Sequence, residues 1–109
     1  MRVVATQGAV GGVQITGAAA TPTGSGGAQI TFTLSSPASC EATVLNIAGR
    51  PVRTLASSGV QPAGTSVMLW DGRGSTGTQV PAGTYLVRIT ARSDDGVVTS
   101  ALRNLRVGR

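Results

Sequence analysis

The sequence contains no histidine and no lysine, a single cysteine and only three aromatic residues. Without histidine there is no imidazole base, no histidine metal ligand and no Ser-His or Cys-His nucleophile pair. Without lysine there is no Walker-type phosphate clamp, no Schiff base and no Ser-Lys dyad. These absences exclude most hydrolase mechanisms, and we expect a protein that is not an enzyme.

Acidic residues are also scarce, and the four that occur are Glu41, Asp71, Asp94 and Asp95. Asp94 and Asp95 are adjacent, and neighbouring residues on a strand point to opposite faces, so they make a poor catalytic pair. A calcium loop needs several oxygen ligands at alternate positions, and only Asp71, Ser75 and Thr76 are at hand. We therefore expect no catalytic residue, no cofactor and no metal site; a weak calcium site at Asp71 is the less favoured alternative.

Long apolar runs are absent as well. Residues 3–5 are apolar, but the run stops at Thr6, short of a secretory core of ~7–15 residues, and no stretch is long enough for a membrane span. The lone Cys40 cannot form an intrachain disulfide, so the redox compartment stays open. No activating cation flanks it in the sequence, and we interpret it as a small, half-buried apolar residue.

The net charge of +5 is carried entirely by arginine. One interpretation is attraction to an anionic partner, with Arg88 and Arg92 as the candidate contacts. The favoured one is that charged outer faces keep the strands soluble. Because the arginines are scattered and aromatic residues are few, the sequence argues against a nucleic-acid-binding surface, which needs a basic patch and stacking platforms.

Apolar and polar residues alternate with a period of two, and no amphipathic helix pattern competes with this alternation. It is clearest at 30–34 and at 84–92, where Tyr85, Val87 and Ile89 share one face and Arg88 and Arg92 lie mainly on the other. Further strands are predicted at 13–16, 39–48, 52–55, 66–70 and about 97–107, with a flexible turn at 24–27. Seven to eight short strands are typical of an antiparallel β-sandwich, with a barrel as the alternative.

The length of 109 residues fits one domain, which we place at residues 13–109. Residues 1–12 contain three glycines and form a separate N-terminal extension. Three interpretations are open for it: a linker from a preceding domain, an extra edge strand, or a donor strand that pairs with a neighbouring subunit.

The stretch from Trp70 to Tyr85 is the most distinctive part of the chain. A phosphate loop would need a following helix and a lysine, and both are missing. We expect instead that Asp71 accepts hydrogen bonds from amides of a turn that Gly72 permits. Trp70 then covers one end of the core, and the Tyr85 hydroxyl bonds back to the backbone near the bend at 81–83, as in a tyrosine corner.

An ordered set of motifs resembles the immunoglobulin-like (FlgD-type) domain of flagellar hook-capping proteins, which is also found at the C-termini of many exported bacterial proteins. The motifs are VLNIAGRPVRTL at 44–55, PAG at 62–64, LWDGR at 69–73, Gly77, and VPAGTY at 80–85. The resemblance covers roughly residues 28–107 and implies an immunoglobulin-like or fibronectin-III-like sandwich. It carries over fold-determining positions and no catalytic residue; these positions are Trp70, Asp71, Gly72, Gly77, Pro81, Ala82, Gly83 and Tyr85.

The resemblance implies a non-catalytic structural or assembly module of an extracellular or cell-surface bacterial protein, such as a spacer, an anchor or a filament subunit. Its partners would be protein, through self-association or neighbouring domains of a larger chain. A hook-capping protein also has an N-terminal export and assembly region that does not fit into this sequence, so the exported-protein version is the closer resemblance. The alternatives are a module that binds carbohydrate or another acidic polymer through Arg88 and Arg92, and a virion decoration protein.

Overall fold

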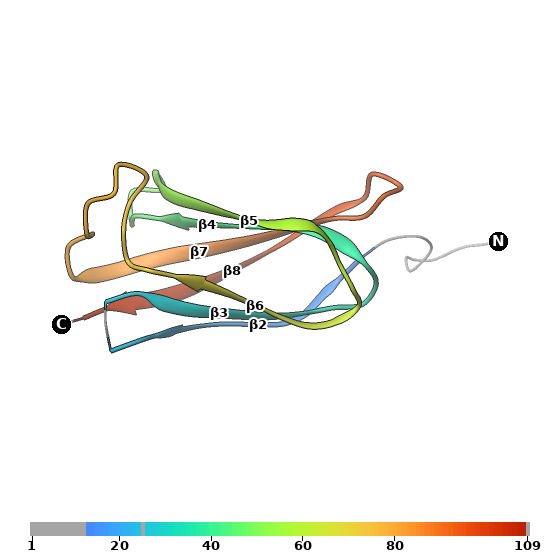
Figure 1. Ribbon diagram of the computed structural model, residues 1–109, viewed down its shortest axis with the longest axis horizontal. Helices are drawn as coiled ribbons and strands as arrows, with labels where there is room; N and C mark the ends of the chain where they lie inside the picture. Colours follow the sequence, from blue (N-terminus) through green and yellow to red (C-terminus); the bar gives the residue numbers. More distant parts are fainter. Residues whose placement is uncertain (1–12, 25, 109) are drawn as a thin grey trace.

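The computed structural model describes residues 13–24 and 26–108, which form seven β-strands and no helix. In chain order the strands are β2 (Ile15–Pro22), β3 (Ala28–Leu34), β4 (Ala38–Leu45), β5 (Pro51–Gln61), β6 (Gly64–Trp70), β7 (Gly83–Arg92) and β8 (Val98–Val107) (Figure 1). No segment of the described residues therefore has the length and helical form needed to cross a membrane.

The strands form two antiparallel sheets that pack face to face (Figure 1). One sheet has three strands in the order β2-β3-β6, and the other has four in the order β5-β4-β7-β8. The predicted fold class, an immunoglobulin-like antiparallel β-sandwich, is confirmed. The sheets meet at one side, where Arg103 Nε of β8 donates a hydrogen bond to the Ala18 carbonyl of β2 (3.0 Å).

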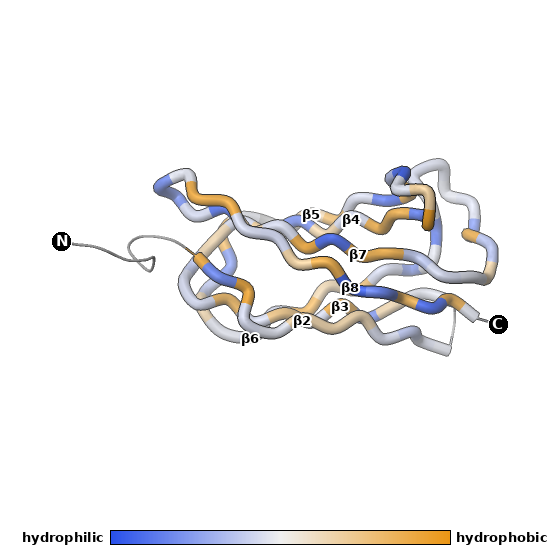
Figure 2. Tube along the Cα trace, turned by 180° about the vertical axis from the view of Figure 1, so that it is seen from behind, coloured by the Kyte–Doolittle hydropathy of each residue, from blue (hydrophilic) through white to orange (hydrophobic). Residues whose placement is uncertain are grey.

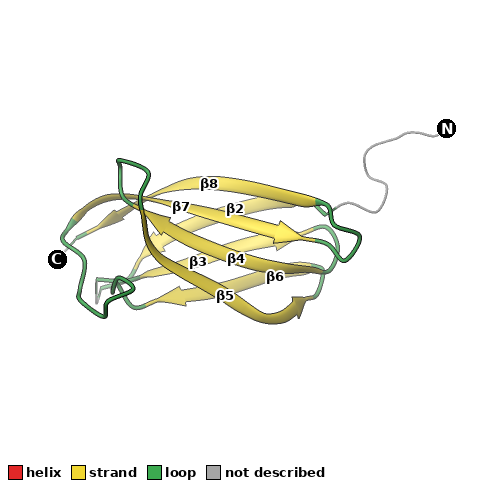
Figure 3. Ribbon diagram, turned by 90° about the horizontal axis from the view of Figure 1, so that it is seen from above, coloured by secondary structure: helices red, strands yellow, loops and turns green. Residues whose placement is uncertain are grey.

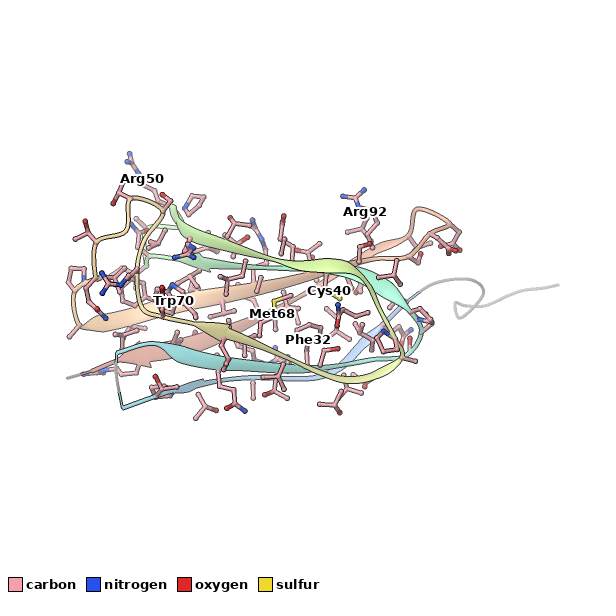
Figure 4. All side chains as sticks on the ribbon, viewed as in Figure 1. Phe32, Cys40, Arg50, Met68, Trp70 and Arg92 are labelled. Carbon is pink, nitrogen blue, oxygen red and sulfur yellow. The ribbon has the colours of Figure 1, made fainter. Side chains whose placement is uncertain are left out.

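Alternation along the strands builds the core. In β7, Tyr85 and Ile89 are buried between the sheets whereas Arg88 and Arg92 are exposed, as the sequence pattern predicts. Figure 2 shows the same alternation of apolar and polar residues along the chain trace. The largest fully buried side chain is Phe32 of β3, which lies between the sheets (Figure 4). Burying such a side chain contributes about 1.5–3 kcal/mol, so the alternating pattern accounts for much of the stability.

The strand β5 is longer than its predicted range of 52–55. It continues to Gln61, because after an irregularity opposite 39–41 it resumes pairing with β4, where Ser39 lies opposite Val60. Gly59 has a φ of +88°, which glycine adopts without strain. Residues 56–61, which lie beyond the predicted strand, therefore form the irregular second half of an edge strand.

The bounds of other strands also differ from the predicted ones. The strand predicted at 39–48 ends at Leu45, because Asn46 begins a turn in which its Oδ1 accepts hydrogen bonds from the backbone N–H groups of Ala48 and Arg50. The strand predicted at 13–16 begins at Ile15 and continues to Pro22. The one predicted at 30–34 begins at Ala28. Residues 1–12, with the predicted linker, edge strand or donor strand, lie outside the described residues.

Candidate functional site

Trp70 and Tyr85 form an aromatic corner at one end of the sandwich. Trp70 ends β6, and its indole Nε1 donates a hydrogen bond to the Arg73 carbonyl (2.9 Å). The Tyr85 ring, from β7, packs edge-on against it, with centroids 6.3 Å apart and an interplanar angle of 66°. The Tyr85 hydroxyl donates to the Pro81 carbonyl (2.7 Å). One strand of each sheet is thereby fastened to the loop at 71–82.

Asp71 lies at the start of this loop, and its carboxylate contacts an amide and a guanidinium. Oδ1 accepts a hydrogen bond from the Arg73 backbone N–H (3.0 Å) and lies 3.4 Å from Arg53 Nη1 of β5. The same Arg53 Nη1 donates to the Arg73 carbonyl (3.1 Å). Because the carboxylate accepts a hydrogen bond from the backbone N–H two residues further along the chain, Asp71 has the geometry of a turn-forming aspartate. No group of three or more potential side-chain metal ligands occurs within the residues described.

The rest of the loop is bonded to itself. Gly77 has a φ of +88°, and its carbonyl accepts a hydrogen bond from Arg73 Nη1 (2.9 Å). The backbone N–H of Val80 donates to the Gly72 carbonyl (2.9 Å), so the loop returns to its own start. The bend at 81–83 then leads into β7, with Pro81 and Ala82 exposed. These positions shape the connection between β6 and β7.

The predicted flexible turn at 24–27 is instead partly locked against the corner. Gly26 and Gly27 are buried, and a Cβ atom on Gly27 would overlap the Trp70 carbonyl oxygen. A Cβ atom on Gly72, whose φ is +83°, would overlap the Gly26 carbonyl oxygen. The backbones of Gly26 and Gly72 are therefore in direct contact. This contact could not be predicted from local sequence patterns, because the two glycines lie far apart along the chain.

The candidate anion contacts Arg88 and Arg92 are both exposed on the outer face of β7. Arg106 of β8 shares this face, and Glu41 of β4 is the acidic residue among the outward-facing strand positions there. In Figure 4 the Arg92 side chain points away from the sandwich. The four-stranded sheet thus presents a mildly basic outer face.

The described residues also form hollows. One, of about 830 Å³, lies at the end opposite the corner, between the β3–β4 connection and the β7–β8 turn. Serines dominate its polar lining, with Arg92 and Asp94 as the charged groups. A second, of about 570 Å³, lies beside Asp71, Arg53 and Arg73, whose polar groups the corner already uses. At the first hollow, Ser93 Oγ donates a hydrogen bond to Asp95 Oδ1 and accepts one from the Val97 backbone N–H, so these groups are used to form the β7–β8 turn.

Cys40 is more deeply buried than the half-buried position expected. It faces inward on β4, is only 4% exposed, and its Sγ lies 3.7 Å from the Ala38 carbonyl oxygen. Burial raises the pKa of its thiol above the ordinary value. The thiol is therefore held in its neutral form and is a weak nucleophile.

Sequence reasoning missed the roles of Arg53 and Arg103. Both leave the four-stranded sheet: Arg53 bonds to the loop that follows β6, and Arg103 bonds to the Ala18 carbonyl of β2. Arg103 falls in phase with the buried Leu105 and Val107, so the period-two pattern contained a signal. An arginine at an inward-facing position indicates an edge where its guanidinium can reach the opposite sheet.

Comparison of the sequence and the structure with known proteins identifies a matching protein family. The model of the FlgD Ig-like domain family matches residues 17–95. The chain is similar to the crystal structure of FlgD from P. aeruginosa, with 25% sequence identity and a TM-score of 0.61. That match covers 72% of this chain and 58% of the FlgD chain, so the similarity spans little more than half of that protein's length.

A second solved structure shares the fold alone. CopC from Methylosinus trichosporium OB3b is 13% identical, with a TM-score of 0.59, and the match covers 87% of this chain and 92% of that chain. Among curated proteins the sequence has no significant match. The evidence for family membership therefore comes from the domain model and the first structure.

Proposed function

The chain belongs to the FlgD Ig-like domain family, and from this premise we propose that it is a structural or assembly module of an extracellular or cell-surface bacterial protein. In this role it would act as a spacer, an anchor or a filament subunit and would bind protein, either further copies or neighbouring domains. The family to which it belongs is structural and non-enzymatic. The chain would contribute a rigid scaffold rather than a reaction.

The observation that carries this proposal is the use made of the family's motif residues. The polar groups of Trp70, Asp71 and Tyr85 all bond to the backbone or side chains of the domain itself. A binding or catalytic loop would instead hold such groups ready for a ligand. Because these polar groups form hydrogen bonds within the domain, they support a role as a rigid scaffold.

Location is tested in the bacterium that makes the protein. A short epitope inserted in the exposed β7–β8 turn, at 94–96, leaves every strand intact. On intact cells we expect antibody binding to the epitope and its loss after external protease. A cytoplasmic protein as control must stay uncut in the same cells. Labelling that needs lysed cells, with the epitope in the soluble interior, would contradict the proposed location.

The basic face of the four-stranded sheet favours a second candidate, binding of an acidic polysaccharide. Arg88 and Arg92 are exposed four residues apart on one strand, where alternate residues share a face. On a sulfated polysaccharide column, the double variant Arg88→Gln/Arg92→Gln should elute at clearly lower salt than Arg2→Gln/Arg50→Gln, which loses the same charge elsewhere. Equal elution would show unspecific attraction by net charge and would reject this candidate.

A further inference from the structure

The four strand edges of the sandwich are not equally protected. The edges of β2 and β8 face each other and are joined by the Arg103 bond to the Ala18 carbonyl. The edge of β5 starts with Pro51, and its pairing with β4 has two register irregularities, which twist a strand away from regular pairing. Proline, charge and bulges are the devices by which proteins block edge-to-edge association.

The edge of β6 has none of these devices. Its seven residues, GTSVMLW, contain no charge and no proline, and within the described residues it pairs only with β3. Val67 and Leu69 on its outer face are 53% and 70% exposed. A regular, uncharged edge with exposed apolar side chains is a template for an added strand.

The side of the sandwich beside β6 is formed by two edge strands. The three-stranded sheet ends at β6 and the four-stranded sheet ends at β5, and Figure 3 shows β5 crossing β6 on this side. Val52 and Leu55 of β5, together with Met68 of β6, are only partly buried along this side. One further strand next to β6 would cover them and give four strands in each sheet.

We infer that the β6 edge accepts residues 3–10 of a second copy of this chain as an added strand. The inference rests on the proposed assembly function and gives that function its site. Residues 3–10, VVATQGAV, carry no charge and no proline. At ~3.4 Å per residue they extend about 27 Å, against about 24 Å for β6.

Charge favours this contact between copies. Two copies of a chain with net charge +5 repel each other unless they meet through neutral surfaces. The strands β2, β3 and β6 contain no charged residue, so the added strand enters the neutral part of the molecule. The arginines of the described residues lie on the other sheet and in loops, and Arg2 directly precedes the added segment.

Cross-linking identifies the occupant. Full-length chains carrying Ala5→Cys are mixed with full-length chains carrying Leu69→Cys, and a flexible bis-maleimide is added. The unsubstituted chain, whose single thiol is buried, is the control. We expect a cross-linked dimer that contains one chain of each kind. Absence of that dimer overturns the inference. A further chain that carries both substitutions tests contact within one molecule, and a cross-link that forms only within such single chains also overturns the inference.

A matched pair of charge substitutions tests the edge. Val67 and Leu102 are 53% and 51% exposed on strands of different sheets. Val67→Lys should weaken self-association in sedimentation equilibrium by at least about tenfold, which corresponds to about 1.4 kcal/mol, whereas Leu102→Lys should leave it unchanged. Thr65→Lys, at the same edge, should reproduce the loss while circular dichroism stays that of the parent chain.

Equal effects of Val67→Lys and Leu102→Lys, or no effect of either, overturn the strand addition. The cell-surface assay with the turn epitope is independent of this edge. Failure of the edge substitutions with normal surface exposure therefore rejects the strand addition alone, whereas an interior location rejects the proposed function.

Discussion

The outer faces of the two sheets differ in charge. The three-stranded sheet presents only uncharged residues, with Thr31 and Thr33 of β3 in the middle and Val67 and Leu69 of β6 at one edge. The four-stranded sheet presents Arg88, Arg92 and Arg106, with Glu41 among them. Charge on one face keeps a protein soluble, while a neutral face allows close contact, so the two faces suit different tasks.

The sheets also differ in how they are fastened to the corner. In the neutral sheet, Gly27, just before β3, lies in backbone contact with the Trp70 carbonyl, in addition to the indole bond of Trp70 to the loop. The basic sheet is held by side chains, through the Tyr85 hydroxyl of β7 and the Arg53 guanidinium of β5. Backbone contacts leave no room for added atoms, whereas side-chain bonds can be removed one at a time.

The largest effect is expected from breaking the backbone contact. Gly27→Ala places a methyl group on the Trp70 carbonyl oxygen, and only backbone movement can relieve the overlap. We expect a loss of about 3 kcal/mol or more in the free energy of unfolding, measured by urea denaturation. The control is Gly24→Ala, where a Cβ atom meets nothing within 4 Å. Similar stability for both variants would contradict the close contact.

The next effect is expected from the side-chain bonds of the basic sheet. Tyr85→Phe keeps the ring against Trp70 and removes only the hydrogen bond to the Pro81 carbonyl. We expect a loss of about 1 kcal/mol, because Pro81 is exposed and water can take the place of the lost donor. Thermal unfolding measures it. A loss as large as that of Gly27→Ala would remove the distinction between the two modes of fastening.

The sequence predicts those parts of the fold that depend on local pattern. The alternation at 84–92 identifies which side chains of β7 face the core, and the residue order at 69–73 identifies the corner. What it does not reveal depends on partners far along the chain. The packing of Gly27 on Trp70 and the reach of Arg103 to Ala18 join segments separated by more than 40 residues. The second half of β5 is a strand only because β4 lies beside it.

A smaller effect is expected at Asp71. Asp71→Ala removes the acceptor of the Arg73 amide and the partner of Arg53, but the carboxylate is 57% exposed. Exposed ion pairs contribute little, so we expect a loss of about 0.5–1 kcal/mol in urea denaturation. Asp71→Asn, which keeps an acceptor oxygen, should recover most of it. If Asn is as damaging as Ala, then the ion pair with Arg53 outweighs the turn.

The smallest expected effect is a difference between the two sheets in titratable side chains, which changes stability with pH. The strands β2, β3 and β6 contain no titratable side chain, whereas β4 of the other sheet buries Cys40. Burial raises the pKa of this thiol in the folded protein above its ordinary value of 9.0. The unfolded chain then loses its thiol proton at lower pH than the folded one. The contribution to stability is therefore complete below pH 9 and falls as the pH rises further.

Urea denaturation of the parent chain and of Cys40→Ala across this pH range isolates that contribution. We expect the stability of the parent to fall more steeply above pH 9 than that of the variant, because only the parent carries the thiol. Alkylation at neutral pH should be slow in the folded parent and fast in urea, since the neutral thiol is inaccessible. Parallel pH profiles together with rapid alkylation would mean that the inner face of β4 is open to solvent, and the four-stranded sheet would then be the looser of the two.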